Sequence, residues 1–117
     1  MKRILVAEDE SAVAQLLKDN LKNSYEIDIA YDGAQIESKL DQHNYDLVLL
    51  DLNMPDFNPP EFLRELYTRD PGIRVIIVSG SIDRSYTEDF PSVQGIITKP
   101  FRREILKDMV KQTLNRS

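Results

Sequence analysis

The sequence of 117 residues has no cysteine, no tryptophan and a single histidine, His43. Without cysteine the chain can form neither a disulfide framework nor a thiolate metal site, which is typical of proteins from a reducing cytoplasm. No apolar run approaches the length of a transmembrane helix, and the run after the first three residues ends at Ala7, too soon for a signal peptide. These absences indicate a cytoplasmic protein that does not enter a membrane.

Basic clusters are also missing. The net charge is −5, and no block of lysine or arginine occurs along the chain. Direct nucleic-acid binding therefore has no electrostatic basis. The hydrophobic content of 41% and the charged content of 30% are ordinary for a globular protein. We expect one domain over residues 1–117, large enough to bury a core without disulfides.

Short apolar runs alternate with helical patterns along the chain. Strands are predicted at residues 4–7, 25–30, 47–50, 75–78 and 96–97, and helices at 11–21, 34–42, 59–69, 82–90 and 101–114. Continuous apolar runs such as 47–50 are typical of parallel strands that are covered on both faces. The alternation predicts an α/β fold, with a doubly wound, mostly parallel sheet and helices on both faces.

The first and last predicted helices each show an apolar stripe at helical spacing. In the first helix Ser11 is the expected N-cap. The stripe of that helix consists of Val13, Leu16, Leu17 and Leu21. The inner face of the last helix consists of Ile105, Leu106, Met109, Val110 and Thr113. We expect both stripes to pack against the sheet.

Polar side chains follow four of the predicted strands. They are Glu8, Asp9 and Glu10 after the first strand, Asp51 after the third, Ser79 after the fourth and Lys99 after the fifth. Because the carboxyl ends of parallel strands share one edge of a sheet, we expect these side chains to lie close together. Taken singly, each has an ordinary explanation as a helix-start acid, a turn residue or a solvated charge. Together they favour a ligand site.

This cluster suits one kind of chemistry. Two carboxylates about 5 Å apart repel by about 3 kcal/mol, so three of them need a cation, and oxygen-only ligands favour Mg²⁺. With the metal bound, one carboxylate can attack an electrophilic phosphorus atom and form an acyl phosphate. Lys99 and Ser79 can supply the charge and the donor that the phosphoryl oxygens require.

Four segments together resemble the bacterial response-regulator receiver domain of two-component signalling. They are ILVAEDE at 4–10, DLVLLDLNMP at 46–55, VSG at 78–80 and TKPF at 98–101. The resemblance extends over nearly the whole chain and implies a CheY-like, flavodoxin-like fold with the strand order 2-1-3-4-5. It also implies a cis peptide bond between Lys99 and Pro100.

The resemblance implies a role for each residue of the cluster. Asp51 would be the phosphoacceptor, Ser79 the switch hydroxyl and Lys99 the cation that pairs with the phosphoryl group. The implied Mg²⁺ ligands are the side chains of Glu8, Asp9 and Asp51 and the backbone carbonyl of Asn53.

The family's partners are implied in the same way. A receiver domain takes its phosphoryl group from a sensor histidine kinase or a phosphotransfer protein, and then switches a surface that binds a downstream effector or output domain. It assists only its own phosphorylation and dephosphorylation, so we do not expect an enzyme that acts on other substrates. The sequence leaves the oligomeric state open.

Two departures from the family pattern affect these expectations. The family often has an aromatic residue three positions before the lysine, where this chain has Ile96. We therefore expect phosphorylation to be reported by backbone movement around Ser79 and Lys99, with little or no aromatic rotamer switch. The loop after the acceptor usually carries a glycine where this chain has Pro59, which stiffens that loop.

Two other functions fit parts of the pattern. An aspartate-nucleophile phosphatase of the haloacid-dehalogenase type uses the same metal and nucleophile, but it needs a second acid two residues after the nucleophile, where this chain has Asn53. A phosphorylation-independent interaction module on the same scaffold would usually have lost the acceptor, the acids or the lysine. All of these residues are present.

Overall fold

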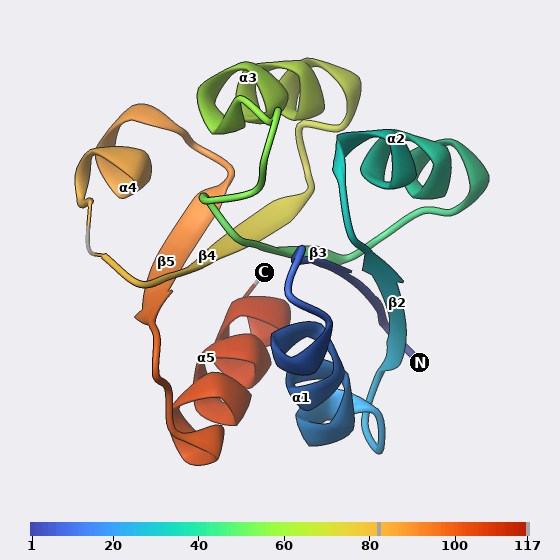
Figure 1. Cartoon of the computed structure of the whole chain (residues 1–117), viewed down its shortest axis with the longest axis vertical. Helices are drawn as coiled ribbons and strands as arrows, with labels where there is room; N and C mark the ends of the chain where they lie inside the picture. Colours follow the sequence, from blue (N-terminus) through green and yellow to red (C-terminus); the bar gives the residue numbers. More distant parts are fainter. Residues whose placement is uncertain (82, 117) are drawn as a thin grey trace.

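The computed structural model describes residues 1–81 and 83–116 and contains one five-stranded parallel sheet (Figure 1). Its strands are β1 (Arg3–Ala7), β2 (Glu26–Ala30), β3 (Leu47–Leu50), β4 (Arg74–Ser79) and β5 (Val93–Thr98). They lie in the order β2-β1-β3-β4-β5, and every adjacent pair is parallel. The predicted fold class and strand order are confirmed.

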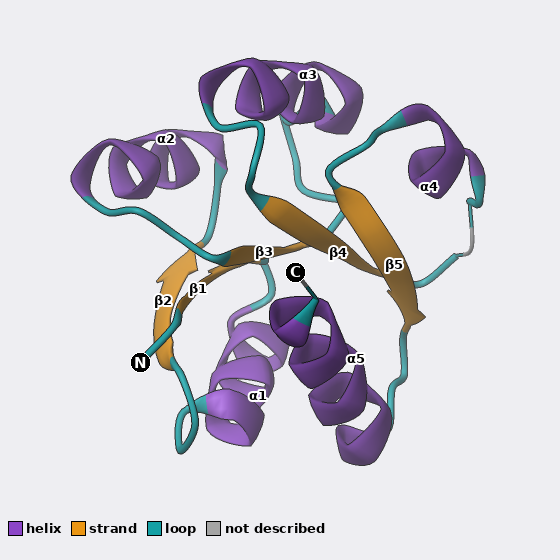
Figure 2. Cartoon of the chain, turned by 180° about the vertical axis from the view of Figure 1, so that it is seen from behind, coloured by secondary structure: helices purple, strands orange, loops and turns teal. Residues whose placement is uncertain are grey.

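Five helices alternate with the strands. They are α1 (Ser11–Leu21), α2 (Gly33–Gln42), α3 (Pro59–Arg69), α4 (Ser85–Asp89) and α5 (Arg103–Asn115). Helices α1 and α5 cover one face of the sheet, and α2, α3 and α4 cover the other (Figures 1 and 2). None of these helices combines the length and apolar character needed to cross a membrane.

The central strands are buried on both faces, as their continuous apolar runs predict. All four residues of β3 are buried, and so are the last five residues of β4. Each face of the sheet forms its own apolar cluster, one towards α2 and α3 and the other towards α1 and α5. The register of these strands decides which residues leave the core at their carboxyl ends.

Side-chain caps start two of the helices. The Asp32 carboxylate accepts a hydrogen bond from the Gln35 amide at 2.8 Å at the start of α2, and the Asn58 side chain accepts one from the Glu61 amide at 3.1 Å at the start of α3. Prolines 59 and 60 occupy the first two positions of α3, where their missing N–H groups cost nothing. These starts agree with the sequence to within one residue.

The predicted Ser11 cap is wrong. The cap position of α1 is Glu10, which has extended backbone angles, and no side chain caps the helix there. The Glu10 amide instead donates a hydrogen bond to the buried Glu8 carboxylate at 3.2 Å. The chain therefore enters the helix one residue earlier than the serine suggests, because Glu8 binds the backbone at this point.

Two residues of the predicted apolar stripes are also misplaced. Leu16 on α1 is 50% exposed and Ile105 on α5 is 52% exposed. Each precedes a fully buried leucine, Leu17 or Leu106, and one residue turns a helix by about 100°. The apolar stripe predicted from the sequence of each helix is therefore wider than the helix face that packs against the sheet.

The predicted element boundaries also change. Strand β5 is longer than the predicted segment 96–97, and α4 has only five residues within the predicted 82–90. Residue 82, the start of that prediction, lies outside the described residues. Gln94 and Gly95 interrupt the apolar residues of β5, so only part of this edge strand has the continuous apolar character used to predict it.

A polar network links the start of β1 with β2 and with the segment before β3. The buried Tyr45 hydroxyl donates a hydrogen bond to the Asp28 carboxylate at 2.7 Å, and the Arg3 guanidinium contacts the same carboxylate at 3.0 Å. Burial opposes the charged form of Asp28, but the bonds from Tyr45 and Arg3 outweigh it and hold the pKa of Asp28 below its ordinary value. The network therefore stabilises the fold while Asp28 is ionised.

The Tyr45→Phe variant is expected to lose about 1–2 kcal/mol of unfolding free energy at neutral pH, because Asp28 loses a hydrogen-bond donor. A carboxyl group whose pKa is lowered by folding stabilises the fold above its unfolded pKa, and this contribution disappears as pH falls through the folded pKa. The difference between the variant and the wild type should therefore shrink in acid. Urea titrations at neutral and acidic pH measure it, and a difference that stays constant into acid would contradict this account.

Candidate functional site

The register of the strands brings the predicted cluster together at one edge of the sheet. Ala7 pairs with Leu50, and Ser79 pairs with Thr98, so Glu8, Asp51 and Lys99 each follow a paired strand end. The backbone continues the ladder for one residue, since the Asp51 amide donates to Ala7 and the Lys99 amide donates to Ser79. The side chains at this edge are therefore held by regular sheet hydrogen bonds.

Lys99 links the two buried carboxylates of the site. Its ammonium nitrogen lies 2.5 Å from the Glu8 carboxylate and 3.7 Å from Oδ1 of Asp51. Glu8 is 1% exposed and Asp51 is 3% exposed. Two carboxylates removed from water need a cation beside them, and the Lys99 ammonium supplies it.

Lys99 and Glu8 each change the pKa of the other. Burial alone would lower the pKa of Lys99, but the Glu8 and Asp51 carboxylates outweigh burial and raise it, so the ammonium stays charged. Burial raises the pKa of Glu8 to about 7 against the opposing effect of Lys99, and the nearby Asp51 adds to the rise. One cation therefore does not fully compensate two buried carboxylates.

A second group of acids lies on the outer side of Glu8. Glu8, Asp9 and Glu10 each place one carboxylate oxygen within 4.8 Å of a carboxylate oxygen of the other two. Asp9 is half-buried and Glu10 is exposed. The donor set is oxygen alone, with no imidazole or thiolate, and it carries an excess of negative charge beside Lys99. These features fit a hard divalent cation such as Mg²⁺.

Asp51 and Ser79 are each fixed by the backbone that follows them. Oδ1 of Asp51 accepts a hydrogen bond from the Asn53 amide at 3.1 Å, and Ser79 Oγ accepts one from the Ser81 amide at 3.3 Å. Both acceptor residues are buried, whereas Asn53 is exposed at the edge of the site. The second carboxylate oxygen of Asp51 takes no part in this bond.

Sequence reasoning did not foresee the direct contact between Lys99 and Glu8. It assigned Glu8 to a metal and Lys99 to a phosphoryl group, but the structure pairs these residues with each other. The sequence does contain a signal for this contact. Glu8 directly follows an apolar strand, so its carboxylate is expected to be buried and to need a cation beside it. The Lys99–Pro100 peptide bond is cis, as the resemblance implied.

Comparison with known proteins decides the family. The sequence matches the model of the response regulator receiver domain over residues 4–111. The chain belongs to this family. Members of the family are phosphoacceptors in signalling, and the chain is the receiver domain of a response regulator.

The curated relatives of this receiver domain include a protein of similar length and longer proteins. The chemotaxis protein CheY of Bacillus subtilis is 32% identical, over 97% of this chain and 98% of that protein. The regulatory protein VanRB of Enterococcus faecalis is 31% identical over 98% of this chain, and the cell cycle transcriptional regulator CtrA of Caulobacter vibrioides is 33% identical over 98%. The receiver domain spans 53% of VanRB and 51% of CtrA, about half of each length.

Solved structures agree with the fold of this receiver domain. The response regulator TrrA of Thermotoga maritima, in complex with Mg²⁺-BeF, is 34% identical with a TM-score of 0.82, over 97% of this chain and 99% of that one. A CheY-like receiver domain protein of Methanospirillum hungatei is 26% identical with a TM-score of 0.89, over 98% and 94% of the two chains.

The two departures from the family pattern take clear positions in this receiver domain. Ile96 is half-buried and packs against the apolar cluster on the α2 and α3 face. Pro59 begins α3 directly after the Asn58 cap. The loop between β3 and α3 contains Asp56, whose φ of 53° is uncommon for a residue other than glycine. This receiver domain thus differs from the common pattern beside the site, while the cluster itself is complete.

Proposed function

We propose that this receiver domain accepts a phosphoryl group on Asp51 from the phosphohistidine of a sensor histidine kinase or a phosphotransfer protein. The observation that carries the proposal is the buried Asp51 carboxylate, 3.7 Å from the Lys99 ammonium at the carboxyl edge of the sheet. A carboxylate at this position can act as a nucleophile, and the neighbouring cation can stabilise the charge of the phosphorylated product.

The residues support a transfer in which atoms and charges balance. The free carboxylate oxygen of Asp51 attacks phosphorus, an oxygen–phosphorus bond forms, and the phosphorus–nitrogen bond to the donor histidine breaks. The electron pair of that bond returns to the imidazole nitrogen. The product is an acyl phosphate on Asp51, whose added charge attracts the Lys99 ammonium away from Glu8 and the Ser79 hydroxyl towards a phosphoryl oxygen.

The proposed Mg²⁺ ligands are the side chains of Glu8, Asp9 and Asp51 and the backbone carbonyl of Asn53. When bound, the metal supplies positive charge that screens the carboxylates from the incoming phosphoryl oxygens. Glu10 lies within the same group of acids and would add negative charge beside the metal ligands.

The proposed consequence of phosphorylation is a movement of the backbone around Ser79 and Lys99, which changes a surface that an effector or output domain binds. Ile96 provides no aromatic ring that could swing between two positions. The phosphatase alternative is disfavoured by Asn53, whose side chain cannot act as the acid that such an enzyme requires at this position. We place this signalling step in the cytoplasm, together with the kinase.

Incubation with Mg²⁺ and acetyl phosphate tests the proposal. Intact-mass analysis should detect one added phosphoryl group, and a chelator added before the donor should prevent its appearance. If no adduct forms with acetyl phosphate or with a phosphorylated histidine kinase, the domain acts as an interaction module that does not use phosphorylation. If the domain instead hydrolyses generic phosphate esters with many turnovers, and Asp51→Asn abolishes this activity, the phosphatase function is correct.

A further inference from the structure

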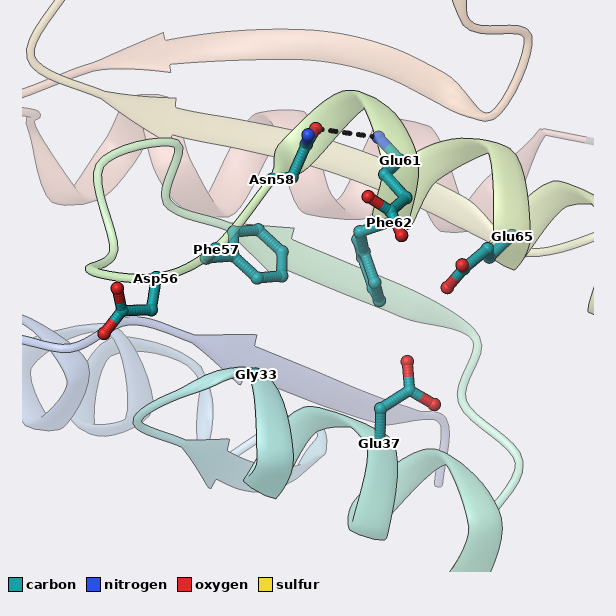
Figure 3. Close-up of a pocket in the computed structure, with 8 residues that line it drawn as sticks. All are labelled: Gly33, Glu37, Asp56, Phe57, Asn58, Glu61, Phe62 and Glu65. Atoms are coloured by element: carbon teal, nitrogen blue, oxygen red, sulfur yellow. Dashed lines mark hydrogen bonds between the residues drawn. The ribbon is translucent and has the colours of Figure 1, made fainter.

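A groove between α2 and α3 combines two aromatic rings with an acidic border. It encloses about 290 Å³, and the side chains used below are Glu37 of α2, Phe57 of the preceding loop, and Glu61, Phe62 and Glu65 of α3. The Phe57 and Phe62 rings lie with centroids 5.4 Å apart at a tilted angle. In Figure 3 Glu37 rises from α2, while Phe62 and Glu65 descend from α3 into the same gap. The volume is suited to a side chain and too small for a large cofactor.

The charges around the groove are incompletely compensated. No described lysine or arginine lines it, and within residues 1–81 and 83–116 neither Glu61 nor Glu65 forms an ion pair. Both glutamates are exposed, and Phe57 is half-buried. Asp56 lies at one end of the groove with its carboxylate turned away from the gap (Figure 3). The groove therefore offers an aromatic floor and two unpaired carboxylates to a ligand.

The outer side of the groove already binds one guanidinium group. Arg69, at the end of α3, lies 3.1 Å from the Glu37 carboxylate and also contacts Asp41. Arg69 does not line the groove itself, so its charge reaches Glu37 from outside. Glu37 and Asp41 of α2 thus bind the guanidinium group of Arg69 from α3. This contact shows that the carboxylates beside the groove can bind an arginine side chain.

We propose that the groove is a docking site for an arginine side chain of a partner protein. The planar guanidinium group can stack on the exposed part of the Phe57 ring while it donates hydrogen bonds to Glu61 and Glu65. A lysine ammonium lacks the planar surface and gains less from the rings. The site lies on the α2 and α3 face, and it is separate from the carboxylates that surround Lys99, so its occupation does not require phosphorylation of Asp51.

Binding of a small arginine peptide tests the site directly. The probes are acetyl-Gly-Arg-Gly-amide and the same peptide with citrulline, a neutral side chain of nearly the same shape, followed by amide nitrogen–proton NMR of the whole domain. The arginine peptide should give saturable shifts of the amides of Gly33, Phe57, Asn58, Glu61 and Phe62, with a Kd of about 1–10 mM for a single side chain. The citrulline peptide should bind at least about tenfold more weakly, because it carries no charge.

Matched charge variants separate this site from general attraction to an acidic protein. The double variant Glu61→Gln/Glu65→Gln should weaken the arginine peptide about tenfold, whereas Glu88→Gln/Glu104→Gln, which removes two exposed acids from α4 and α5, should leave the Kd unchanged. Phe57→Leu should reduce the preference for arginine over lysine, and its spectrum reports whether the fold is kept. Equal binding of citrulline, equal weakening in both double variants, or shifts centred outside the groove would overturn the proposal.

Discussion

The Lys99→Ala variant is expected to accept the phosphoryl group from acetyl phosphate about 10²-fold more slowly than the wild type. The ammonium is the only described cation within 4 Å of the Asp51 carboxylate, and its loss leaves Glu8 and Asp51 as two buried acids without a counter-ion. The developing charge on the phosphoryl oxygens then depends on the metal and on Ser79 alone. The rate of adduct formation, followed by intact mass at saturating Mg²⁺, measures the effect.

The expected loss must come from the site and not from the fold. Lys107→Ala removes an exposed lysine from α5 and should retain the wild-type rate. The far-ultraviolet circular dichroism of Lys99→Ala should match the wild type, because a buried carboxyl group can become protonated when its cation is removed. An unfolded Lys99→Ala variant would mean that Lys99 is mainly structural, and a wild-type rate would remove it from the transfer step.

The second large effect concerns Glu8 in the metal-free domain. Burial raises the pKa of Glu8 to about 7 from an ordinary value of 4.5. Between these values the folded domain binds a proton that the unfolded chain has released, so the free energy of unfolding falls as pH rises through this window. At 1.36 kcal/mol per pKa unit, the wild type should lose about 3 kcal/mol between about pH 4 and pH 8 from this group.

The Glu8→Gln variant isolates that contribution. It should be more stable than the wild type at about pH 8 by about 3 kcal/mol, and the difference should become small near pH 4, where Glu8 is mostly protonated in both the folded and the unfolded wild type. Urea unfolding in the presence of a chelator measures both differences. Added Mg²⁺ should stabilise the wild type at about pH 8 and have little effect on Glu8→Gln, because a metal that binds the folded state alone shifts unfolding. A difference between the two proteins that does not change with pH would contradict the account.

The architecture was predictable because the buried central strands of a parallel sheet have continuous apolar runs, which are easily recognised in a sequence. Segments 47–50 and 75–78 are continuous apolar runs, and both are central strands with complete burial. The edge strand β5 was harder, because Gln94 and Gly95 interrupt its apolar pattern. Leu16 and Ile105 show the limit of helical periodicity, since an apolar residue beside the packed stripe can remain exposed without large cost.

The positions of the site residues were predictable, but their pairing was not. Each of Glu8, Asp51 and Lys99 follows a strand, and parallel topology places strand ends together. Which acid the lysine contacts depends on side-chain conformation and on the depth of burial, and neither can be read from spacing. The groove between α2 and α3 was missed for a related reason, because Glu37 and Glu65 come from separate helices whose crossing geometry is set by packing.

The central claim is that Asp51 is the phosphoacceptor, and residue mapping tests it most directly. The wild type is incubated with Mg²⁺ and acetyl phosphate, the acyl phosphate is reduced with borohydride, and the modified residue is located by peptide mass spectrometry. We predict modification of Asp51 alone, none in Asp51→Asn, and wild-type modification in Asp108→Asn, a control at an exposed aspartate of α5. Modification at another residue, or an adduct that persists in Asp51→Asn, would contradict the claim.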